Sequence, residues 1–89
     1  MHATPGHIRP RLALRRRQYD RLMHARMLTT ARAQAQLIGV APTTISRILD
    51  GDVVPSTDFV ARACHALGVP LDDLFEIELV AADVEEVAA

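Results

Sequence analysis

Apolar side chains along the middle of the chain recur every three or four residues, which is the spacing of one face of a helix. The first such stripe predicts a helix that begins at about Arg11 or Leu12. Its members are Tyr19, Leu22, Met23, Arg26 and Met27, with the arginine at the edge. Further stripes predict helices over 31–38, 42–50 and 57–67, and a short fifth helix around 71–75. The pattern therefore indicates a small bundle of helices.

Residues that favour helix ends mark the boundaries of these segments. Thr29 or Thr30 is a suitable N-cap for the second helix, because a threonine hydroxyl accepts a hydrogen bond from a free N–H group of the first turn. Pro42 suits the first position of the third helix, where no N–H is needed. Gly51 is expected to end this third helix, and Ser56 is expected to cap the fourth.

The two helices within residues 31–50 are separated only by a tight turn at Gly39-Val40. The small residue Ala35 allows the helices to approach closely, and Gly39 can adopt the left-handed conformation that ends the first of them. Val40, Ile45 and Ile48 are then expected to face a shared core. This arrangement is typical of a DNA-binding helix-turn-helix.

Charge is divided unevenly along the chain. Residues 1–47 contain nine arginines and one acid, Asp20, whereas residues 48–89 contain one arginine, Arg62, and ten acids. The net charge of −1 conceals this division. A basic half joined to an acidic half is expected of a domain that binds a polyanion on one side, and a solvated charged surface is the alternative.

The two end segments have less regular patterns. Residues 1–10 contain two prolines and a glycine, and they are predicted to form a flexible basic arm. Arg9, with the neighbouring Arg11, follows a DNA backbone, enters a minor groove or has no role. Residues 77–89 form an acidic extension in which alternation from Phe75 to Leu79 permits a strand, but helical spacing continues further, so a helix is favoured. The apolar stripe of this extension predicts homodimerisation or docking on another protein.

No arrangement of reactive side chains indicates catalysis, a metal or a cofactor. The four histidines are scattered, and the adjacent Cys64 and His65 project about 100° apart on a helix, which is poor geometry for a nucleophile and its base. A lone cysteine excludes an internal disulfide and a cysteine-based zinc finger, so Cys64 is expected to be a small buried side chain. No apolar run reaches the ~20 residues of a membrane span, and the N-terminus lacks the apolar core of a secretory signal. A cytoplasmic, nucleoid-associated protein that is not an enzyme is expected.

A series of short motifs follows the same order and spacing as in a known family. They are Gly39-Val40, Thr44-Ile45-Ser46-Arg47-Ile48, Asp50-Gly51, Pro55-Ser56, Ala66-Leu67-Gly68-Val69 and Leu71-Asp72-Asp73-Leu74-Phe75. Through them, residues 19–76 resemble the phage repressor/Cro-like helix-turn-helix family of the xenobiotic-response-element type. The resemblance implies an all-α fold, a compact five-helix lambda-repressor-like bundle over residues 11–76, with the third helix in the major groove.

The exposed face of helix 42–50 carries the candidates for reading bases, which are Thr43, Thr44, Ser46 and Arg47. Arginine to guanine is the commonest specific contact in the major groove, and a phosphate contact is the alternative for Arg47. Each threonine offers a hydroxyl and a methyl group to a base edge, unless it is simply a solvent-exposed helix residue. The candidates for phosphate contacts flank this motif or lie in the basic arm, and they are Arg26, Thr30, Arg32, Pro42, Arg9 and Arg11.

Three features depart from the family's pattern. Gln34 stands where a buried leucine is usual, and an unpaired buried amide costs about 1–3 kcal/mol, so this side chain is expected to be partnered or near the edge. Ala31 cannot make the phosphate contact of the glutamine that often opens the second helix. Ala41 and Pro42 offer no side-chain hydrogen bond to a base, so base reading falls on the residues that follow.

These features predict a sequence-specific regulator of transcription that binds double-stranded DNA, of the small repressor or Cro type, acting as a homodimer. Two alternatives remain. One is a protein-interaction module, such as an antitoxin or a phage accessory factor, that acts through its acidic C-terminal half and binds its protein partner through residues 77–89. The other is a recombination or architectural DNA-binding protein.

Overall fold

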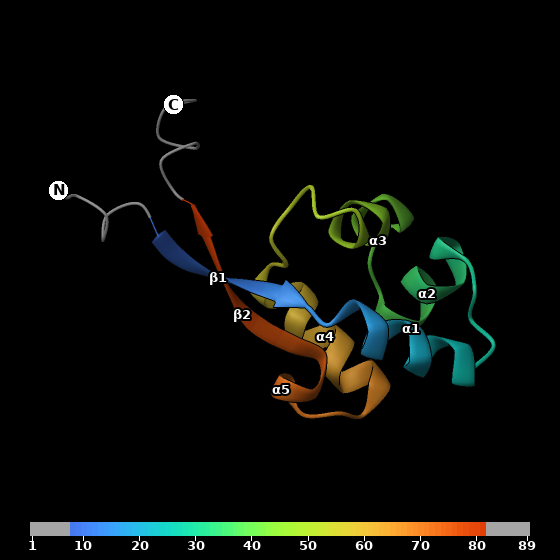
Figure 1. Ribbon diagram of the computed structural model, residues 1–89. Coiled ribbons are helices and arrows are strands. Elements are labelled where there is room, and N and C mark those ends of the chain that lie inside the picture. Colours follow the sequence, from blue (N-terminus) through green and yellow to red (C-terminus); the bar gives the residue numbers. More distant parts are fainter. Residues whose placement is uncertain (1–7, 82–89) are drawn as a thin grey trace, which may run out of the picture.

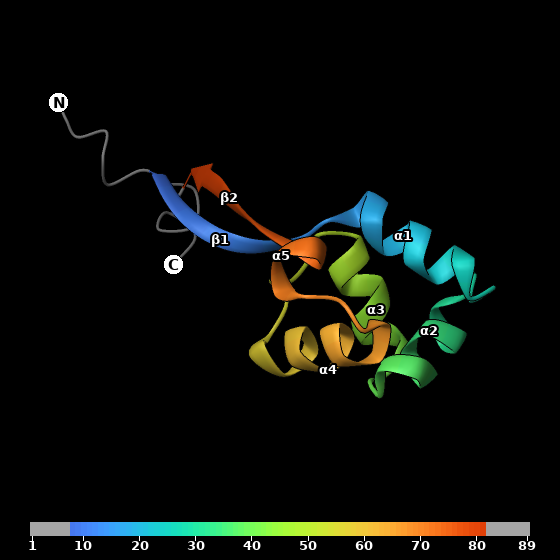
Figure 2. The ribbon, with the colours of Figure 1, turned by 90° about the horizontal axis from the view of Figure 1, so that it is seen from below.

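The computed structural model describes residues 8–81, and in this part of the chain two β-strands enclose five helices in the sequence. The elements are β1 (Ile8–Leu14), α1 (Arg16–Ala25), α2 (Ala31–Ile38), α3 (Pro42–Leu49), α4 (Thr57–Leu67), α5 (Leu71–Leu74) and β2 (Phe75–Ala81). The helices pack into one body, and the strands form an antiparallel ribbon that projects from it (Figure 1, Figure 2).

The prediction of an all-α fold is wrong, because the segments that flank the helices pair with each other as a two-stranded sheet. Residues 8–10, predicted as part of a flexible arm, belong to β1, and residues 77–81, for which a helix was favoured, belong to β2. The register places Leu12 opposite Ile77 and Leu14 opposite Phe75. The alternating pattern from Phe75 to Leu79 is therefore a strand pattern, and its partner lies at the other end of the domain. The rest of the predicted arm and extension, 1–7 and 82–89, lies outside the described residues.

Helix α1 begins at Arg16, later than the predicted start, because the preceding residues are used for β1. Tyr19 and Met23 are buried as expected, at 0% and 1% exposure. Met27, however, is 86% exposed and has a φ of +59°. Its N–H donates to the carbonyl oxygen of His24, and the N–H of the next residue donates to that of Met23, at N···O distances of 2.9 and 3.0 Å. Met27 thus ends the helix in the left-handed position that glycine usually takes.

The core is built from residues of every helix and from the start of β2. Its buried members are Tyr19, Met23, Ala35, Ile38, Ile45, Ile48, Phe59, Ala63, Leu67, Leu74 and Phe75. The rings of Phe59 and Phe75 meet edge to face, with centroids 6.2 Å apart, which fixes β2 against α4. Cys64 is half-buried beside this cluster, and burial raises the pKa of its thiol. The cysteine, expected to be buried, is therefore only partly so.

Two of the predicted caps are confirmed by side-chain hydrogen bonds. Thr30 Oγ1 accepts from the N–H of Ala33 at 3.1 Å at the start of α2. Ser56 Oγ accepts from the N–H of Phe59, also at 3.1 Å, at the start of α4. Each bond satisfies one N–H group that the helix itself leaves free. The local sequence therefore determines where both helices begin.

Candidate nucleic-acid interface

A short turn from Gly39 to Ala41 joins α2 to α3. Gly39 has a φ of +91°, and the N–H groups of Gly39 and Val40 both donate to the carbonyl oxygen of Ala35, at 2.7 and 3.1 Å. A Cβ at residue 39 would lie 3.0 Å from a guanidinium nitrogen of Arg62. Position 39 therefore favours glycine for its backbone conformation and for the space around it. The extended backbone of Ala41 then directs the chain into α3.

The exposed side of α3 carries most of the residues predicted to read bases. Thr43, Ser46 and Arg47 are exposed, whereas Thr44 is half-buried. Ser46 and Arg47 follow Thr43 by three and four residues, so the three side chains share one face of the helix. The surface available to a ligand is therefore formed by these three residues, with Thr44 at its margin.

The N-terminus of α2 is the second part of the motif with properties suited to an anion. The first N–H groups of a helix have no partner within the helix, and its dipole favours negative charge at that end. Arg32 lies in this first turn, its side chain is exposed, and it makes no hydrogen bond or ion pair with any residue of 8–81. Thr30, which caps the helix, is exposed beside it. Both residues remain candidates for phosphate contacts.

The charged residues within the motif's stretch of sequence have one sign. Residues 21–49, which span α2, the turn and α3, contain no acidic side chain and carry the arginines Arg21, Arg26, Arg32 and Arg47. Carboxylates resume at Asp50 and Asp52, directly after α3. The helix dipole of α3 also favours an anion at its N-terminus, at Pro42.

A family model described as a helix-turn-helix domain matches residues 11–76, most of the chain. The chain belongs to the helix-turn-helix domain family. Membership confirms the helix-turn-helix expected from residues 31–50 and indicates DNA binding as the activity of this domain. No curated protein and no solved structure shows a significant match to the chain.

Within this helix-turn-helix domain, Arg26 lies at the end of α1 and has a structural contact that was not expected. Its Nη1 donates to the carbonyl oxygen of Leu22 and its Nη2 to that of Leu67, each at 3.2 Å. The second bond ties the end of α1 to the C-terminal end of α4, where the helix dipole favours a cation. The guanidinium of Arg26 is therefore already engaged by backbone carbonyls, although its side chain is exposed.

The predicted phosphate ligands Arg9 and Arg11 lie on the ribbon. Arg11 Nε is 3.6 Å from a carboxylate oxygen of Glu78 on β2, and Arg9 is opposite Val80. Arg11 also lines a cavity of about 160 Å³ together with Leu49, at the C-terminal end of α3. The structure therefore separates these arginines from the Pro42 end of the recognition helix.

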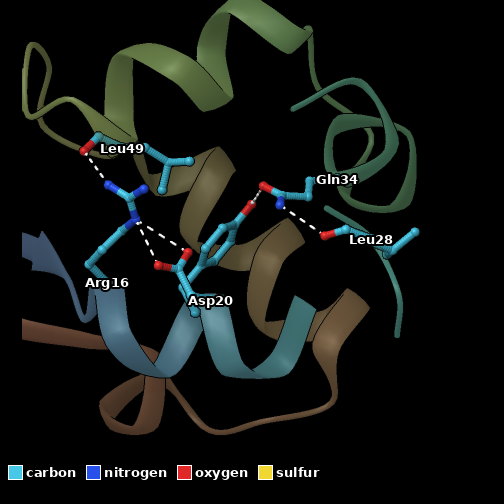
Figure 3. A network of polar contacts seen from close by, with 6 residues as sticks. Arg16, Asp20, Leu28, Gln34 and Leu49 are labelled. Carbon is cyan, nitrogen blue, oxygen red and sulfur yellow. Dashed lines mark hydrogen bonds and ion pairs between the residues drawn. The ribbon is translucent and has the colours of Figure 1, made fainter. Parts of the chain in front are cut away.

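Arg16 is not among the residues that the sequence predicts for the interface, but its guanidinium joins α1 to the last turn of α3 (Figure 3). Its Nη1 donates to the carbonyl oxygen of Leu49 in the last turn of α3, at 3.0 Å. Its Nε lies 3.2 Å from a carboxylate oxygen of Asp20, one turn along α1. The spacing of Arg16 and Asp20 is a sequence signal for their ion pair. The contact with Leu49 has no local signal, because it depends on how α1 and α3 pack.

A buried polar chain joins α1 to α2 behind the motif (Figure 3). Tyr19 Oη donates to Gln34 Oε1 at 2.8 Å, and Gln34 Nε2 donates to the carbonyl oxygen of Leu28 at 3.0 Å. Gln34 was expected to be either partnered or near the edge of the core. It is only 8% exposed, and its amide is hydrogen-bonded at both the oxygen and the nitrogen, so it is partnered. Burial, with a smaller contribution from the Asp20 carboxylate, raises the pKa of Tyr19 to about 12, and the charge of Arg16 opposes this shift. The phenol is therefore neutral at physiological pH.

Part of the charge division along the sequence is neutralised inside the domain. Arg15 Nη1 lies 3.0 Å from Glu76 Oε1, and Arg11 Nε lies 3.6 Å from Glu78 Oε1, so both pairs join the basic half to the acidic half. By contrast, the arginines whose side chains make no hydrogen bond or ion pair with any part of residues 8–81 are Arg17, Arg32 and Arg47. Two of these three belong to the helix-turn-helix, so uncompensated positive charge is present on α2 and α3.

Among residues 8–81, no group of three or more histidine, cysteine or acidic side chains is arranged to hold a metal ion. None of the helices over the same residues has the length and apolar character needed to cross a membrane.

Proposed function

We propose that the protein is a sequence-specific regulator of transcription of the small repressor or Cro type, which binds double-stranded DNA with α3 in the major groove. The proposal depends on one observation. Helix α3 presents Thr43, Ser46 and Arg47 on an exposed face, within a stretch that has no acidic side chain. Such a surface combines long-range attraction to phosphates with side chains able to reach base edges.

The proposed contacts follow from the chemistry of each side chain. Arg47 is the one long donor on this face, and its planar guanidinium matches the O6 and N7 acceptors of guanine. Thr43, in the first turn, offers a hydroxyl and a methyl group, while the shorter Ser46 suits the groove edge. Arg32 and Thr30 at the N-terminus of α2 are proposed to contact phosphate, with α3 contributing its N-terminus at Pro42.

We also propose that the protein acts as a homodimer on the DNA of the nucleoid, without catalytic activity or a cofactor. A single recognition helix reads only a few base pairs. Dimers that read paired half-sites ~34 Å apart gain specificity without a larger domain.

The proposal is tested by selecting binding sites from random DNA and then measuring affinity for the selected site and for a shuffled sequence of the same length. Arg47→Ala is expected to weaken binding to the selected site by about 1–3 kcal/mol and to have a much smaller effect on the shuffled DNA. Arg47→Lys keeps the charge but loses the planar fork, so it is expected to reduce specificity with little change in salt dependence.

Arg32→Ala is the matched variant for a phosphate contact. It is expected to lower affinity evenly for both DNAs and to reduce the slope of log K against log[salt] by about one. Equal losses on both DNAs for Arg47→Ala would instead make Arg47 a phosphate ligand. Affinity that does not depend on salt would contradict the electrostatic basis of the proposal. Failure to select any sequence, together with binding to random DNA, would favour an architectural role.

A further inference from the structure

The two faces of the β1–β2 ribbon have different chemistry. Residues paired across the strands share a face, and every second pair is apolar. These pairs are Ile8–Ala81, Pro10–Leu79, Leu12–Ile77 and Leu14–Phe75. Arginines and glutamates lie on the opposite face, where Arg11 meets Glu78. One face of the ribbon is therefore free of charge along its length.

This apolar face is covered only where it meets the helices. Phe75 is 2% exposed, whereas Ile77 is 65%, Leu79 is 70% and Ile8 is 50% exposed. The exposed part projects beyond the helical body, as both views show (Figure 1, Figure 2). A two-stranded ribbon is marginally stable alone, and a contiguous exposed apolar surface on a small domain marks an interaction site.

The two outer edges of the ribbon also differ. The N–H of Arg15 donates to the carbonyl oxygen of Leu74 at 2.8 Å, and pairs of an antiparallel ladder alternate between bonded and non-bonded. Pro10 and Leu79 therefore belong to a non-bonded pair, in which backbone groups point outward to the two free edges. Pro10 has no N–H, so the β1 edge is interrupted at its centre. The β2 edge has no proline and offers N–H and carbonyl groups at Ile77 and Leu79.

We propose that a second copy of the chain adds to this open β2 edge, antiparallel and across a two-fold axis, to form a four-stranded sheet with the order β1-β2-β2-β1. The inference rests on the proposed function, since it assigns the interface of the proposed homodimer. Each copy then contributes the same edge to the interface, as two-fold symmetry requires. The apolar faces of the two ribbons join into one surface, and no charged residue lies on it.

Charge disfavours the registers that are shifted toward the helices. Outward-pointing residues of β2 must pair with each other, which permits Leu79 opposite Leu79 of the partner subunit, a shift toward the helices, or a shift the other way that leaves fewer residues of β2 paired. With Leu79 on the axis, Glu78 lies opposite the partner's Val80. The next registers place Glu78 opposite Glu78 of the partner subunit or opposite the partner's Glu76, and like charges directly opposed are destabilising. The register centred on Leu79 avoids both conflicts.

The arrangement has a consequence for the recognition helices. Each helical body lies at the inner end of its own ribbon, so the two-fold axis through Leu79 places the two copies of α3 on either side of the central sheet. Symmetry-related α3 helices match inverted half-sites in DNA. The dimer is therefore expected to bind a palindromic site.

The first experiment is cysteine cross-linking in the full chain with Cys64→Ala as background. Leu79→Cys is expected to form a disulfide-linked dimer in air, because bonded antiparallel pairs have Cα atoms ~5.5 Å apart, within the range of a disulfide. Pro10→Cys is the control. In the proposed sheet the two copies of residue 10 are about three strand spacings of ~4.8 Å apart, so no disulfide between them is expected. Cross-linking of the Pro10→Cys variant in place of the Leu79→Cys variant would overturn the proposal by assigning the opposite edge.

The second experiment removes the outward N–H without breaking the ribbon. Leu79→Pro loses no bond of the β1–β2 ladder, because Leu79 points outward, just as Pro10 does on β1. The unmodified chain is expected to sediment at twice the 9.8 kDa of one copy, and Leu79→Pro at the mass of one copy with an unchanged circular dichroism spectrum. Ile8→Pro, on the already interrupted edge, is expected to remain a dimer.

A monomeric unmodified chain, or a Leu79→Pro variant that remains dimeric, would overturn the interface. If selective DNA binding persists in that case, the proposed function still holds. Conversely, a dimer that cross-links at residue 79 without selective DNA binding would support the interface and contradict the proposed function.

Discussion

Replacing Tyr19 by phenylalanine removes one oxygen atom from the core and leaves Gln34 Oε1 without its donor. The bond that is lost is 2.8 Å long, and its acceptor belongs to a side chain that is 8% exposed. Leaving such a group unsatisfied costs about 1–3 kcal/mol. For a domain of this size the melting temperature is expected to fall by about 4–8 °C for each kcal/mol.

A double-mutant cycle separates this cost from the loss of packing. Gln34→Leu leaves the Tyr19 hydroxyl and the Leu28 carbonyl unpaired and is expected to destabilise the domain by a similar amount. The double variant Tyr19→Phe/Gln34→Leu removes both partners of the central bond. Its free energy of unfolding, measured by urea denaturation, is expected to exceed the additive value by about 1 kcal/mol or more. Strict additivity, or a Tyr19→Phe variant as stable as the parent, would refute the role assigned to this network.

The same tyrosine gives the domain an alkaline limit. Its pKa is raised to about 12 in the folded chain, against 10.0 for the ordinary group. The neutral phenol therefore makes its full contribution to the stability of the fold below pH 10. As the pH rises from 10 to 12, the unfolded chain loses its phenolic proton first, and roughly 2–3 kcal/mol of stability is lost. The chain has no lysine and no other tyrosine, and the Cys64 thiol is common to parent and variant. The stability difference between parent and Tyr19→Phe is therefore expected to shrink over this interval, and a constant difference would contradict it.

Three further predictions concern backbone conformation and the support of α3, and each is checked by urea denaturation. Gly39→Ala is expected to cost more than Gly68→Ala, because both have positive φ but only the first places a Cβ against a neighbouring guanidinium; equal losses would mean that backbone strain alone decides. Arg16→Ala is expected to lower the free energy of unfolding by about 1 kcal/mol. Arg17→Ala, which replaces the adjacent arginine whose side chain has no partner among residues 8–81, is expected to change it by close to nothing, and similar losses in both variants would contradict the structural role of Arg16. Met27→Gly is expected to stabilise the domain by about 0.5–1 kcal/mol by relieving the left-handed strain, and a loss would show that the side chain compensates for it.

The parts of the fold that could be predicted are those with local signals. Thr30 and Ser56 cap the helices that the apolar spacing outlines, and Gly39 ends α2 where the helix-turn-helix requires it. Each of these signals acts within a few residues of the position that it determines. The same holds for the buried face of α3, where Ile45 and Ile48 follow helical spacing.

The ribbon could not be derived in this way, because neither strand is determined by its own sequence. Residues 77–81 fit a helical spacing that continues to the end of the chain, and the alternation from Phe75 to Leu79 is short. Pro10 in the centre of β1 also argues against a strand, unless its missing N–H faces a free edge. Both segments are strands only because residues 8–14 and 75–81 pair with each other.

The candidate interface was predicted in part for the same reason. Exposure of Thr43, Ser46 and Arg47 follows from helical geometry, which the sequence shows. The contacts that engage Arg11 and Arg26 are long-range, with Glu78 and Leu67. A basic residue near the motif in sequence can therefore be used for contacts within the domain.

The pairing of β1 with β2 also affects the order of events during folding. The helices form through contacts between neighbouring segments, but the ribbon joins residues from opposite ends of the domain, and the entropy of closing so long a loop must be overcome first. A ribosome releases β1 first and β2 last, so β1 has no partner in the ladder until synthesis of the domain is complete. The helical body is expected to assemble before the ribbon closes. Since each strand is the other's partner, truncation at either end of the domain leaves the remaining strand without its ladder.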